Sequence, residues 1–239
     1  MRLVHSIIFW LINVLFVLIG GGLTHLFVMI FSHKERDIIH FARRSWVRIS
    51  LLIAGVRVKV EGRENIPSAG TFLFVCNHQS YLDIYVVQDI LPDRFAWIAW
   101  DLIFKIPIFG GLMKRSGSIA INDSNRKEAY RAMLEAIDVA KKGESMVIFP
   151  EGKISLDGRI GPFGNGAAML AIEAGIPIIP LALRGTGQIM PKGSYLLKPG
   201  EVKVRIGKAI TFDQPAKIDR RSYDEVTERI RRSVEDLFN

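Results

Sequence analysis

Residues 71–83 read TFLFVCNHQSYLD, and this stretch combines the pattern that decides the fold with side chains capable of chemistry. Residues 71–76 are almost all apolar, over the length of a buried strand. An amide, an imidazole and a carboxylate follow at Asn77, His78 and Asp83. Because α/β sheets place functional groups where strands end, the stretch predicts a buried strand that runs into a functional loop.

Short apolar runs of the same kind recur beyond Gly55, separated by stretches with helical periodicity. We therefore expect an α/β fold in which a mixed sheet is flanked by helices, with a membrane helical segment at the N-terminus. Pro177 and Pro180 indicate that one of the strands lies at an edge or carries a bulge. The expected strands are 56–60, 71–76, 146–149, 176–181 and 202–206, and the expected helices are 124–142, 167–174 and 221–238.

The N-terminal residues contain the clearest candidate for a membrane segment. From residue 3 to residue 31 the chain is almost entirely apolar and has no Lys, Arg, Asp or Glu. About 20 apolar residues suffice for a helix to cross a bilayer. A cleaved signal peptide fits less well, because the run is about twice the usual apolar core and lacks an evident cleavage site. The glycines at 20–22 leave open a division into two half-helices that dip into the membrane and return.

Basic residues follow the apolar segment and bear on its orientation. Five lysines or arginines lie between residues 34 and 48, against Arg2 alone before the segment. The positive-inside rule then places the main domain on the cytoplasmic face. Residues 37–54 have the pattern of an amphipathic basic helix, which either packs on the domain core or lies on anionic lipid. We divide the chain into a membrane-anchoring part over 1–54 and one catalytic domain over 55–239.

The overall composition narrows the class of protein. The chain of 239 residues has 49% apolar residues, enough for one substantial core besides a membrane segment. A formal net charge of +8 suits anionic partners, but nucleic acid is disfavoured because no known binding module accompanies the scattered basic residues. Cys76 is the only cysteine, which excludes an internal disulfide framework and a multi-cysteine metal site.

His78 is the only imidazole in the presumed soluble domain, because the other four histidines lie at or before residue 40. Asp83 follows five residues later, and on one helix five residues turn the chain roughly 140° beyond a full circle. The two side chains therefore meet only if His78 lies in the loop and Asp83 in the first turn of the next helix, where the dipole favours a carboxylate. In that geometry Asp83 holds the imidazole while His78 removes a proton from a hydroxyl.

A nucleophile belonging to the protein is harder to find. Ser80 and Cys76 lie close to the histidine, but neither occupies a nucleophile-elbow pattern such as G-x-S-x-G. We therefore expect the hydroxyl to belong to a substrate.

A second polar group follows another short apolar run, at residues 149–153, which read FPEGK. Glu151 and Lys153 flank Gly152 there. A carboxylate and an ammonium at a strand end can bind a polyol or an anion, or they can belong to an ordinary solvated loop. The stretch alone does not decide between these two interpretations.

Together the two polar groups resemble the sequence blocks of a known enzyme family. Residues 77–83, NHQSYLD, resemble the NHxSxxD block of the glycerolipid acyltransferases, the family that includes 1-acylglycerol-3-phosphate acyltransferase. Residues 149–152, FPEG, resemble the start of its FPEGTRS block, and residues 176–181, IPIIPL, resemble its VPIIPV block. Residues 62–67 resemble its usual lead-in. The likeness runs from about residue 55 to about residue 210 in the family's order and spacing.

The resemblance implies a reaction and a set of site residues. It implies that His78 and Asp83 are the catalytic pair and that Glu151 and Gly152 border the acceptor site. The implied donor is an acyl thioester on coenzyme A or acyl carrier protein. The implied acceptor is a lysolipid at the membrane, first of all 1-acylglycerol-3-phosphate, which yields phosphatidic acid in phospholipid biosynthesis. No metal and no redox cofactor is required.

Three departures from the family pattern concern charge and bear on the acceptor. Lys153 and Ile154 stand where the FPEGTRS block has Thr and Arg, and Asp123 stands where a further arginine is usual. Trp100 stands at a position often held by lysine. Because arginine binds phosphate through a rigid fork, its loss favours another acceptor, such as a zwitterionic lysophospholipid or a lyso-aminolipid. Lys153, and Arg126 three residues after Asp123, are the cations expected to compensate.

Two other classes of protein stay open. A membrane-tethered hydrolase or thioesterase would use His78 to activate water, and an acceptor tunnel buried against the bilayer would discriminate against it, because transfer requires water to be excluded. A non-catalytic lipid-binding or scaffold protein is disfavoured, since it needs neither His78 nor Asp83.

Overall fold

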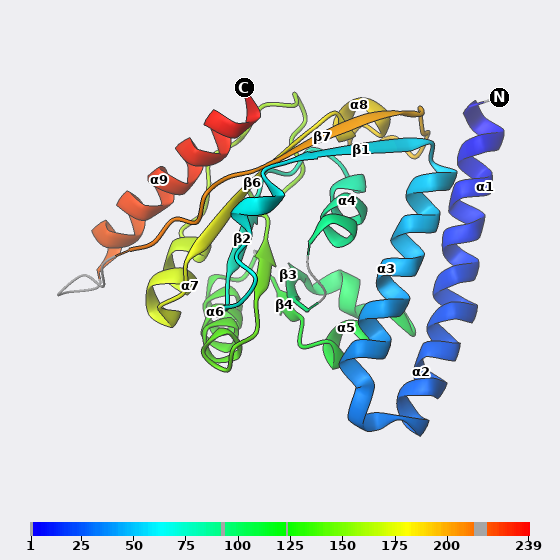
Figure 1. Cartoon of the computed structure of the whole chain (residues 1–239), viewed down its shortest axis with the longest axis horizontal. Coiled ribbons are helices and arrows are strands. Elements are labelled where there is room, and N and C mark those ends of the chain that lie inside the picture. The colour runs from blue at the N-terminus through cyan, green and yellow to red at the C-terminus, as the bar shows by residue number, and fades with distance from the viewer. Residues whose placement is uncertain (1, 92–93, 123, 213–218) are drawn as a thin grey trace.

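The computed structural model describes residues 2–91, 94–122, 124–212 and 219–239. In this part of the chain seven strands form a sheet in the order β1-β7-β6-β2-β5-β3-β4, between two sets of helices (Figure 1). The strands are β1 (Val56–Glu61), β2 (Leu73–Cys76), β3 (Ala96–Trp100), β4 (Ile119–Ile121), β5 (Met146–Ile148), β6 (Ile178–Arg184) and β7 (Gly200–Ile206). The α-helices are α1 (Arg2–Leu15), α2 (Gly21–Ile30), α3 (Glu35–Ile53), α4 (Leu82–Ile90), α5 (Phe109–Arg115), α6 (Arg126–Lys141), α7 (Gly166–Ala174), α8 (Thr186–Ile189) and α9 (Arg220–Phe238).

The sheet is mixed, as expected from the sequence. Neighbouring strands pair in parallel except β6 and β7, which are antiparallel. The five strands from β6 to β4 in the sheet order therefore run in one direction and end at one edge, here called the carboxyl edge. Since β2 and β5 are direct neighbours, the loops that follow them, with His78 and Glu151, meet at this edge.

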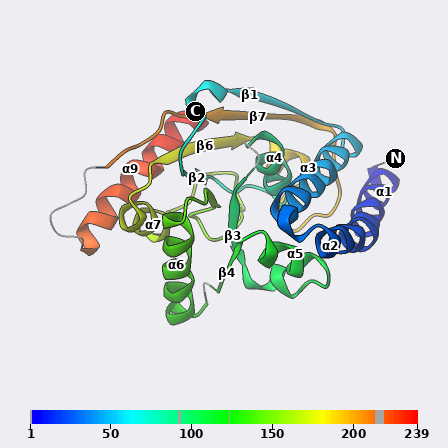
Figure 2. The same cartoon turned by 60° about the horizontal axis from the view of Figure 1, so that its bottom comes forward.

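Helices cover both faces of the sheet, which explains why β2 is apolar throughout. The helices α6, α7 and α9 lie on one face, and α3, α4 and the N-terminal helices lie on the other (Figure 2). Leu73 and Val75 pack in the core under α6 and α7, whereas Phe74 and Cys76 pack in the core under α3 and α4. A strand buried on both faces shows no polar alternation.

The apolar N-terminal segment forms one continuous helix, so the division into two half-helices is wrong. The helix α1 passes into α2 through a π-helical turn, η1 (Phe16–Gly20), and the glycines at 20–22 stay helical. Residues 2–30 are long and apolar enough to cross a membrane by length and composition, and no other helix in the described ranges is. A candidate membrane segment is therefore present where the sequence predicted it.

The helix α3 lies antiparallel beside α1 and α2 and joins them to the rest of the protein (Figure 1). Val47 and Leu51 of α3 lie in the core with residues of α4. On its other side, Asn13 of α1 accepts hydrogen bonds from Trp46 Nε1 (2.8 Å) and Ser50 Oγ (3.0 Å) of α3. Of the two roles considered for this helix, packing on the domain core is therefore the one observed.

All expected strands and helices are present, with ends that shift by a few residues. Gly175 closes α7 with a φ of 67°, the left-handed conformation of a glycine C-cap. The strands β3 and β4 and the helix α5 were not anticipated. Asp123, which stands where the family usually has an arginine, lies outside the described residues.

The two prolines of the 176–181 segment do not mark a sheet edge. The strand β6 lies between β7 and β2, so that alternative is wrong. Ile178 pairs with Ile210, and Leu181 pairs with Ile206. Between these two pairs, β6 has two residues and the segment opposite it has three. The bulge alternative is therefore confirmed, and Pro180, which has no N–H to donate, sits within the interruption.

Candidate active site

The loop after β2 brings an imidazole and a carboxylate into contact at the carboxyl edge. Nδ1 of His78 lies 2.8 Å from Oδ2 of Asp83, within hydrogen-bond distance. His78 belongs to the loop and Asp83 to the first turn of α4, as their spacing predicted. The Asp83 side chain is fully buried, whereas that of His78 is 13% exposed. The pair thus has one member that a substrate can reach.

Asp83 also fixes the backbone of the loop that carries the histidine. Its Oδ2 accepts the N–H groups of Gln79 at 2.6 Å and Ser80 at 2.8 Å. In return the N–H of Asp83 donates to the carbonyl of Ser80 at 3.1 Å. The other oxygen, Oδ1, is buried without a hydrogen-bond partner among the described residues. One carboxylate oxygen therefore holds both the imidazole and the turn beneath it.

The imidazole is held in one plane by aromatic rings. Its ring lies parallel to that of Phe149, with the centroids 4.1 Å apart and the planes 12° apart. Trp97 stacks in turn with Phe149, at 5.8 Å between centroids. Because a carboxylate only accepts, Nδ1 of His78 donates to Asp83 and Nε2 is left as the basic nitrogen. The stack keeps water from one face of the ring and leaves Nε2 to meet a proton donor.

Glu151 uses both carboxylate oxygens to bind backbone. Oε1 accepts the N–H of His78 at 2.8 Å, and Oε2 accepts that of Gly161 at 2.9 Å. Burial raises the pKa of Glu151 above its ordinary value, while the two backbone donors and the nearby His78 act to lower it. Glu151 thus ties the histidine loop to the segment beyond the FPEG stretch. Its expected place at the acceptor site stays a prediction.

The remaining expected site residues differ in exposure and in the element that carries them. Gly152 and Lys153 are exposed, and Ile154 is buried. Arg126 is exposed at the start of α6. That helix follows β4, which is separated from β2 by β5 and β3 in the sheet order. The structure therefore brings Glu151 to His78, and the role expected for Arg126 stays a prediction.

The side chains considered as protein nucleophiles are poorly placed for that role. Cys76 is completely buried, and its burial raises the pKa of the thiol well above the ordinary value. Ser80 is also buried, and its hydroxyl donates to the carbonyl of Met190 at 2.7 Å. Within the described ranges, no group of three or more His, Cys, Asp or Glu side chains is placed to hold a metal ion.

The structural role of Asn77 was not predicted from the sequence. Asn77 is fully buried and exchanges two hydrogen bonds with the backbone of Leu183, through Nδ2 at 2.9 Å and Oδ1 at 2.8 Å. It fastens the end of β2 to β6 immediately before the histidine. An uncharged polar side chain directly after a buried strand was the available signal. The ring stack of Phe149 and Trp97 had no such signal, because those residues are 52 positions apart.

Comparisons with known proteins agree with this geometry. A family model described as Acyltransferase matches residues 57–184. A chloroplast 1-acyl-sn-glycerol-3-phosphate acyltransferase of Brassica napus is 38% identical over 82% of this chain and 57% of its own length. A 1-acyl-sn-glycerol-3-phosphate acyltransferase of Pseudomonas aeruginosa is 29% identical over 87% of this chain and 80% of its own.

The fold is also similar to a solved structure. The crystal structure of the 1-acyl-sn-glycerophosphate acyltransferase PlsC of Thermotoga maritima superposes with a TM-score of 0.82 at 28% identity, over 99% of this chain and 97% of that one. The chain spans a little over half the length of the plant relatives it matches.

Proposed function

Because the chain belongs to the Acyltransferase family, we propose that it transfers a fatty acyl group from an acyl thioester to the free hydroxyl of a lysolipid. The acceptor we assign is 1-acylglycerol-3-phosphate, so that the product is phosphatidic acid in phospholipid biosynthesis. Relatives named for this acceptor support the assignment. The observation that carries the proposal is the contact of 2.8 Å between Nδ1 of His78 and Oδ2 of Asp83.

In the proposed reaction, Nε2 of His78 takes the proton of the acceptor hydroxyl as its oxygen attacks the thioester carbonyl. The resulting tetrahedral intermediate collapses, the carbon–sulfur bond breaks, and the imidazolium returns its proton to the departing thiolate. Asp83 keeps the reactive tautomer and stabilises the imidazolium. The sequence of steps uses no metal and no redox cofactor. The donor thiol belongs to coenzyme A or to acyl carrier protein.

The mechanism is tested by His78→Ala, which removes the base together with its hydrogen bond to Asp83. We expect transfer of a labelled acyl group to lysophosphatidate to fall by at least about 100-fold, while circular dichroism shows that the fold is kept. His33→Ala, in the exposed joint after α2, is the matched control and should transfer normally. Unchanged turnover in His78→Ala would overturn the mechanism.

A second acceptor class is favoured by the charges around the site. Ile154, which stands where the family has arginine, is buried and uncharged, so an acceptor phosphate would depend on other cations, such as the expected Lys153 and Arg126. A panel of acceptors with one labelled donor decides between the two classes. We expect lysophosphatidate to have the highest kcat/KM. A higher value for a zwitterionic lysophospholipid or a lyso-aminolipid would establish the second class instead.

A thioesterase, which would hydrolyse the acyl thioester with water, is the alternative from a different class of enzyme. It can be distinguished from a transferase by the release of free fatty acid. Phe149 and the buried Asp83 leave only part of the imidazole exposed, which supports transfer over attack by water. Release of free fatty acid from the thioester, measured without any acceptor, should be slow compared with transfer. Hydrolysis as fast as transfer would make the protein a thioesterase.

We also propose that the protein attaches to a membrane from its cytoplasmic side without passing through it. The outer face of the N-terminal helix exposes large apolar side chains along its whole length, including those of Leu3, Ile7, Leu11, Leu18, Leu26 and Met29. The helix α3 beside it carries charged residues from Glu35 to Arg48, and each would cost several kcal/mol in the bilayer. The excess of basic residues directly after the apolar segment supports the cytoplasmic side, by the positive-inside rule.

A further inference from the structure

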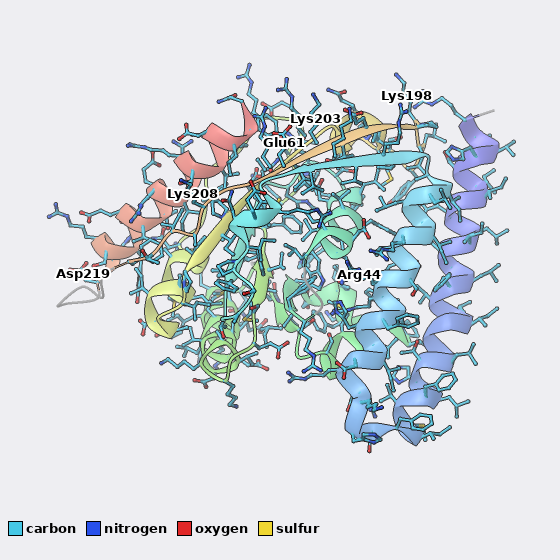
Figure 3. The ribbon with its side chains drawn as sticks, viewed as in Figure 1. Arg44, Glu61, Lys198, Lys203, Lys208 and Asp219 are labelled. Atoms are coloured by element: carbon cyan, nitrogen blue, oxygen red, sulfur yellow. The ribbon has the colours of Figure 1, made fainter. Side chains whose placement is uncertain are left out.

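A cavity of about 340 Å³ lies outside the site just described, between β6, β7 and the C-terminal end of α9. Four charged side chains line it: Arg184, Glu201, Lys203 and Arg205. Figure 3 labels Lys203 over β7, on the side of the molecule where β1 and β7 run across the top. Three of the four charges are positive, so the cavity is suited to an anion.

The arrangement of these cations is unfavourable for the fold alone. Arg184 and Lys203 are direct partners in the antiparallel ladder of β6 and β7, and Lys59 is the partner of Lys203 on β1. Like charges that face each other across strands destabilise a sheet. A row of three cations across three strands therefore repels itself, and a bound anion would relieve that repulsion.

The nearby carboxylates neutralise this row only in part, because Glu201 hydrogen-bonds Lys59 and acts on Lys203 only through its charge. Glu201 pairs with Lys59 at 3.0 Å. Arg205 is already engaged, since it pairs with Glu61 at 3.2 Å and donates to the carbonyl of Leu237 at 3.0 Å. Arg184 and Lys203 have no ion pair with a carboxylate in the part of the chain that the structure describes.

The Arg184 guanidinium is nevertheless held in place. It lies over the ring of Phe238, 5.8 Å from the centroid, which restricts it without satisfying its hydrogen-bond donors. A guanidinium that is positioned but unpaired suits the forked geometry of a phosphate.

The cavity adjoins the histidine loop through α8. Gly185 and Gln188 line the cavity. Between them, a Cβ on Gly187 would come within 3.3 Å of the carbonyl oxygen of Gln79, so the two backbones are in contact. Gln79 is the residue after His78. A ligand in the cavity would therefore lie one short helix away from the reacting atoms.

The position of the cations indicates which substrate carries the anion. Leu183, Val202 and Val204 pack in the core with α4, the helix of Asp83. Because side chains alternate along a strand, Arg184 and Lys203 point to the opposite face of the sheet. In the proposed acceptor the phosphate lies a few bonds from the reacting hydroxyl, which is too close to His78 for this cavity. In a thioester donor a phosphate stands at the far end of a long pantetheine arm.

We propose that this cavity binds the phosphate at the far end of the acyl donor, while the thioester reaches around the carboxyl edge to His78. The inference rests on the proposed acyl transfer. Two sources share this chemistry, the nucleotide phosphates of coenzyme A and the phosphoserine that links pantetheine to acyl carrier protein.

The test is the double variant Arg184→Gln/Lys203→Gln, assayed with acyl-coenzyme A and with acyl carrier protein as donor. We expect the KM for the donor to rise at least about tenfold, with the KM for lysophosphatidate unchanged and turnover recovered at saturating donor. A rise with one donor only identifies which phosphate is bound. The control is Lys198→Gln/Lys208→Gln, which removes the same charge from two other exposed lysines of this surface (Figure 3) and should leave both KM values unchanged.

Three outcomes would overturn the proposal: an unchanged donor KM with both donors, a rise in the acceptor KM instead, or a loss of binding to anionic vesicles as the only effect. A binding measurement keeps the test independent of catalysis. Coenzyme A and unacylated carrier protein are each titrated into the wild type and the double variant by calorimetry. If the wild type binds one of them and the variant does not, the cavity is established even if no acyl transfer is found.

Discussion

At the scale of single residues, the site depends on one carboxylate oxygen. Oδ2 of Asp83 accepts hydrogen bonds from Nδ1 of His78 and from the backbone N–H groups of Gln79 and Ser80. The three donors converge because the loop turns back over the first turn of α4. The orientation of the base and the shape of the loop are therefore set by the same atom.

Asp83→Asn separates these two contributions. The asparagine fits with its oxygen at the Oδ2 position and its amide nitrogen at Oδ1, which has no hydrogen-bond partner in the described ranges. The three hydrogen bonds are then kept, but no negative charge stabilises the imidazolium. We expect kcat to fall about 10²- to 10⁴-fold, with a loss of about 1–3 kcal/mol in the free energy of unfolding.

The matched control is Asp89→Asn on the same helix, where the carboxylate makes a surface ion pair with Arg48. We expect that change to cost less than about 1 kcal/mol and to leave kcat intact. Steady-state kinetics and chemical unfolding measure both quantities. A normal kcat in Asp83→Asn would mean that the charge is not used.

Glu151 should give stability a dependence on pH. Burial raises its pKa in the folded state above the ordinary 4.5, so the folded state binds the proton more tightly than the unfolded state does. The stability from this group is fully present below pH 4.5 and is lost as the pH rises through the raised pKa. Glu151→Gln does not titrate and should lack this decline.

The measurement is the free energy of unfolding of wild type and Glu151→Gln at steps from about pH 4 to about pH 7. The substitution also removes one of the two hydrogen bonds from backbone N–H groups, because the amide NH2 cannot accept one. This loss lowers stability at every pH, so only the slopes are compared. Parallel curves for the two proteins would contradict the assignment of the raised pKa to Glu151.

At the scale of elements, the N-terminal helix is fastened to α3 by a buried polar group. Oδ1 of Asn13 accepts hydrogen bonds from Trp46, from Ser50 and, at 3.0 Å, from the hydroxyl of Tyr85 in α4. One amide in an otherwise apolar helix thus joins three elements. In the sequence, Asn13 stood out only as an interruption of an apolar run.

Asn13→Leu leaves these three buried donors without their acceptor. We expect the free energy of unfolding to fall by at least about 2 kcal/mol, and protease to cleave faster at the joint over residues 31–34. Thr24→Val is the control, because among the described residues the buried hydroxyl of Thr24 donates only to the carbonyl of Gly20 in its own helix. Equal cleavage of the two variants would show that apolar packing alone holds the helix.

At the scale of the whole molecule, the surface has one long apolar side. The N-terminal helix turns its polar residues Ser6, Asn13 and Thr24 toward the protein, where they are buried, and its large apolar residues outward. Such a face is large for a soluble monomer, which supports membrane attachment along this side.

Leu11→Asp/Leu18→Asp should therefore release the protein from vesicles. Burying the two leucines contributes about 1.5–3 kcal/mol each, so we expect vesicle binding to fall at least about 100-fold. Tyr130→Asp/Leu134→Asp, which removes exposed apolar residues of α6, should bind normally. Co-sedimentation measures both. Persistent binding of the first variant would make the basic helix α3 the anchor.

Patterns formed by residues close together in the sequence were sufficient to predict most of the strands and helices. The strand over 71–76, the helices 124–142 and 221–238 and the apolar N-terminal segment were all recognisable, because burial imposes a period or a continuous run on neighbouring residues. The loop position of His78 and the first-turn position of Asp83 followed from the angle that separates residues on a helix.

Other features depended on contacts between distant parts of the chain, and only the tertiary structure decided them. The interior place of β6, the short strands β3 and β4, the stack of Phe149 on His78 and the bonds of Glu151 to backbone all join segments far apart in sequence. The same holds for Arg184 and Lys203, whose juxtaposition depends on the antiparallel pairing of β6 with β7. The sequence determined which groups are available for chemistry, because it specifies the types of these residues and their local spacing. Which of them meet was decided by the order of the strands, since packing between strands, rather than local preference, selects that order.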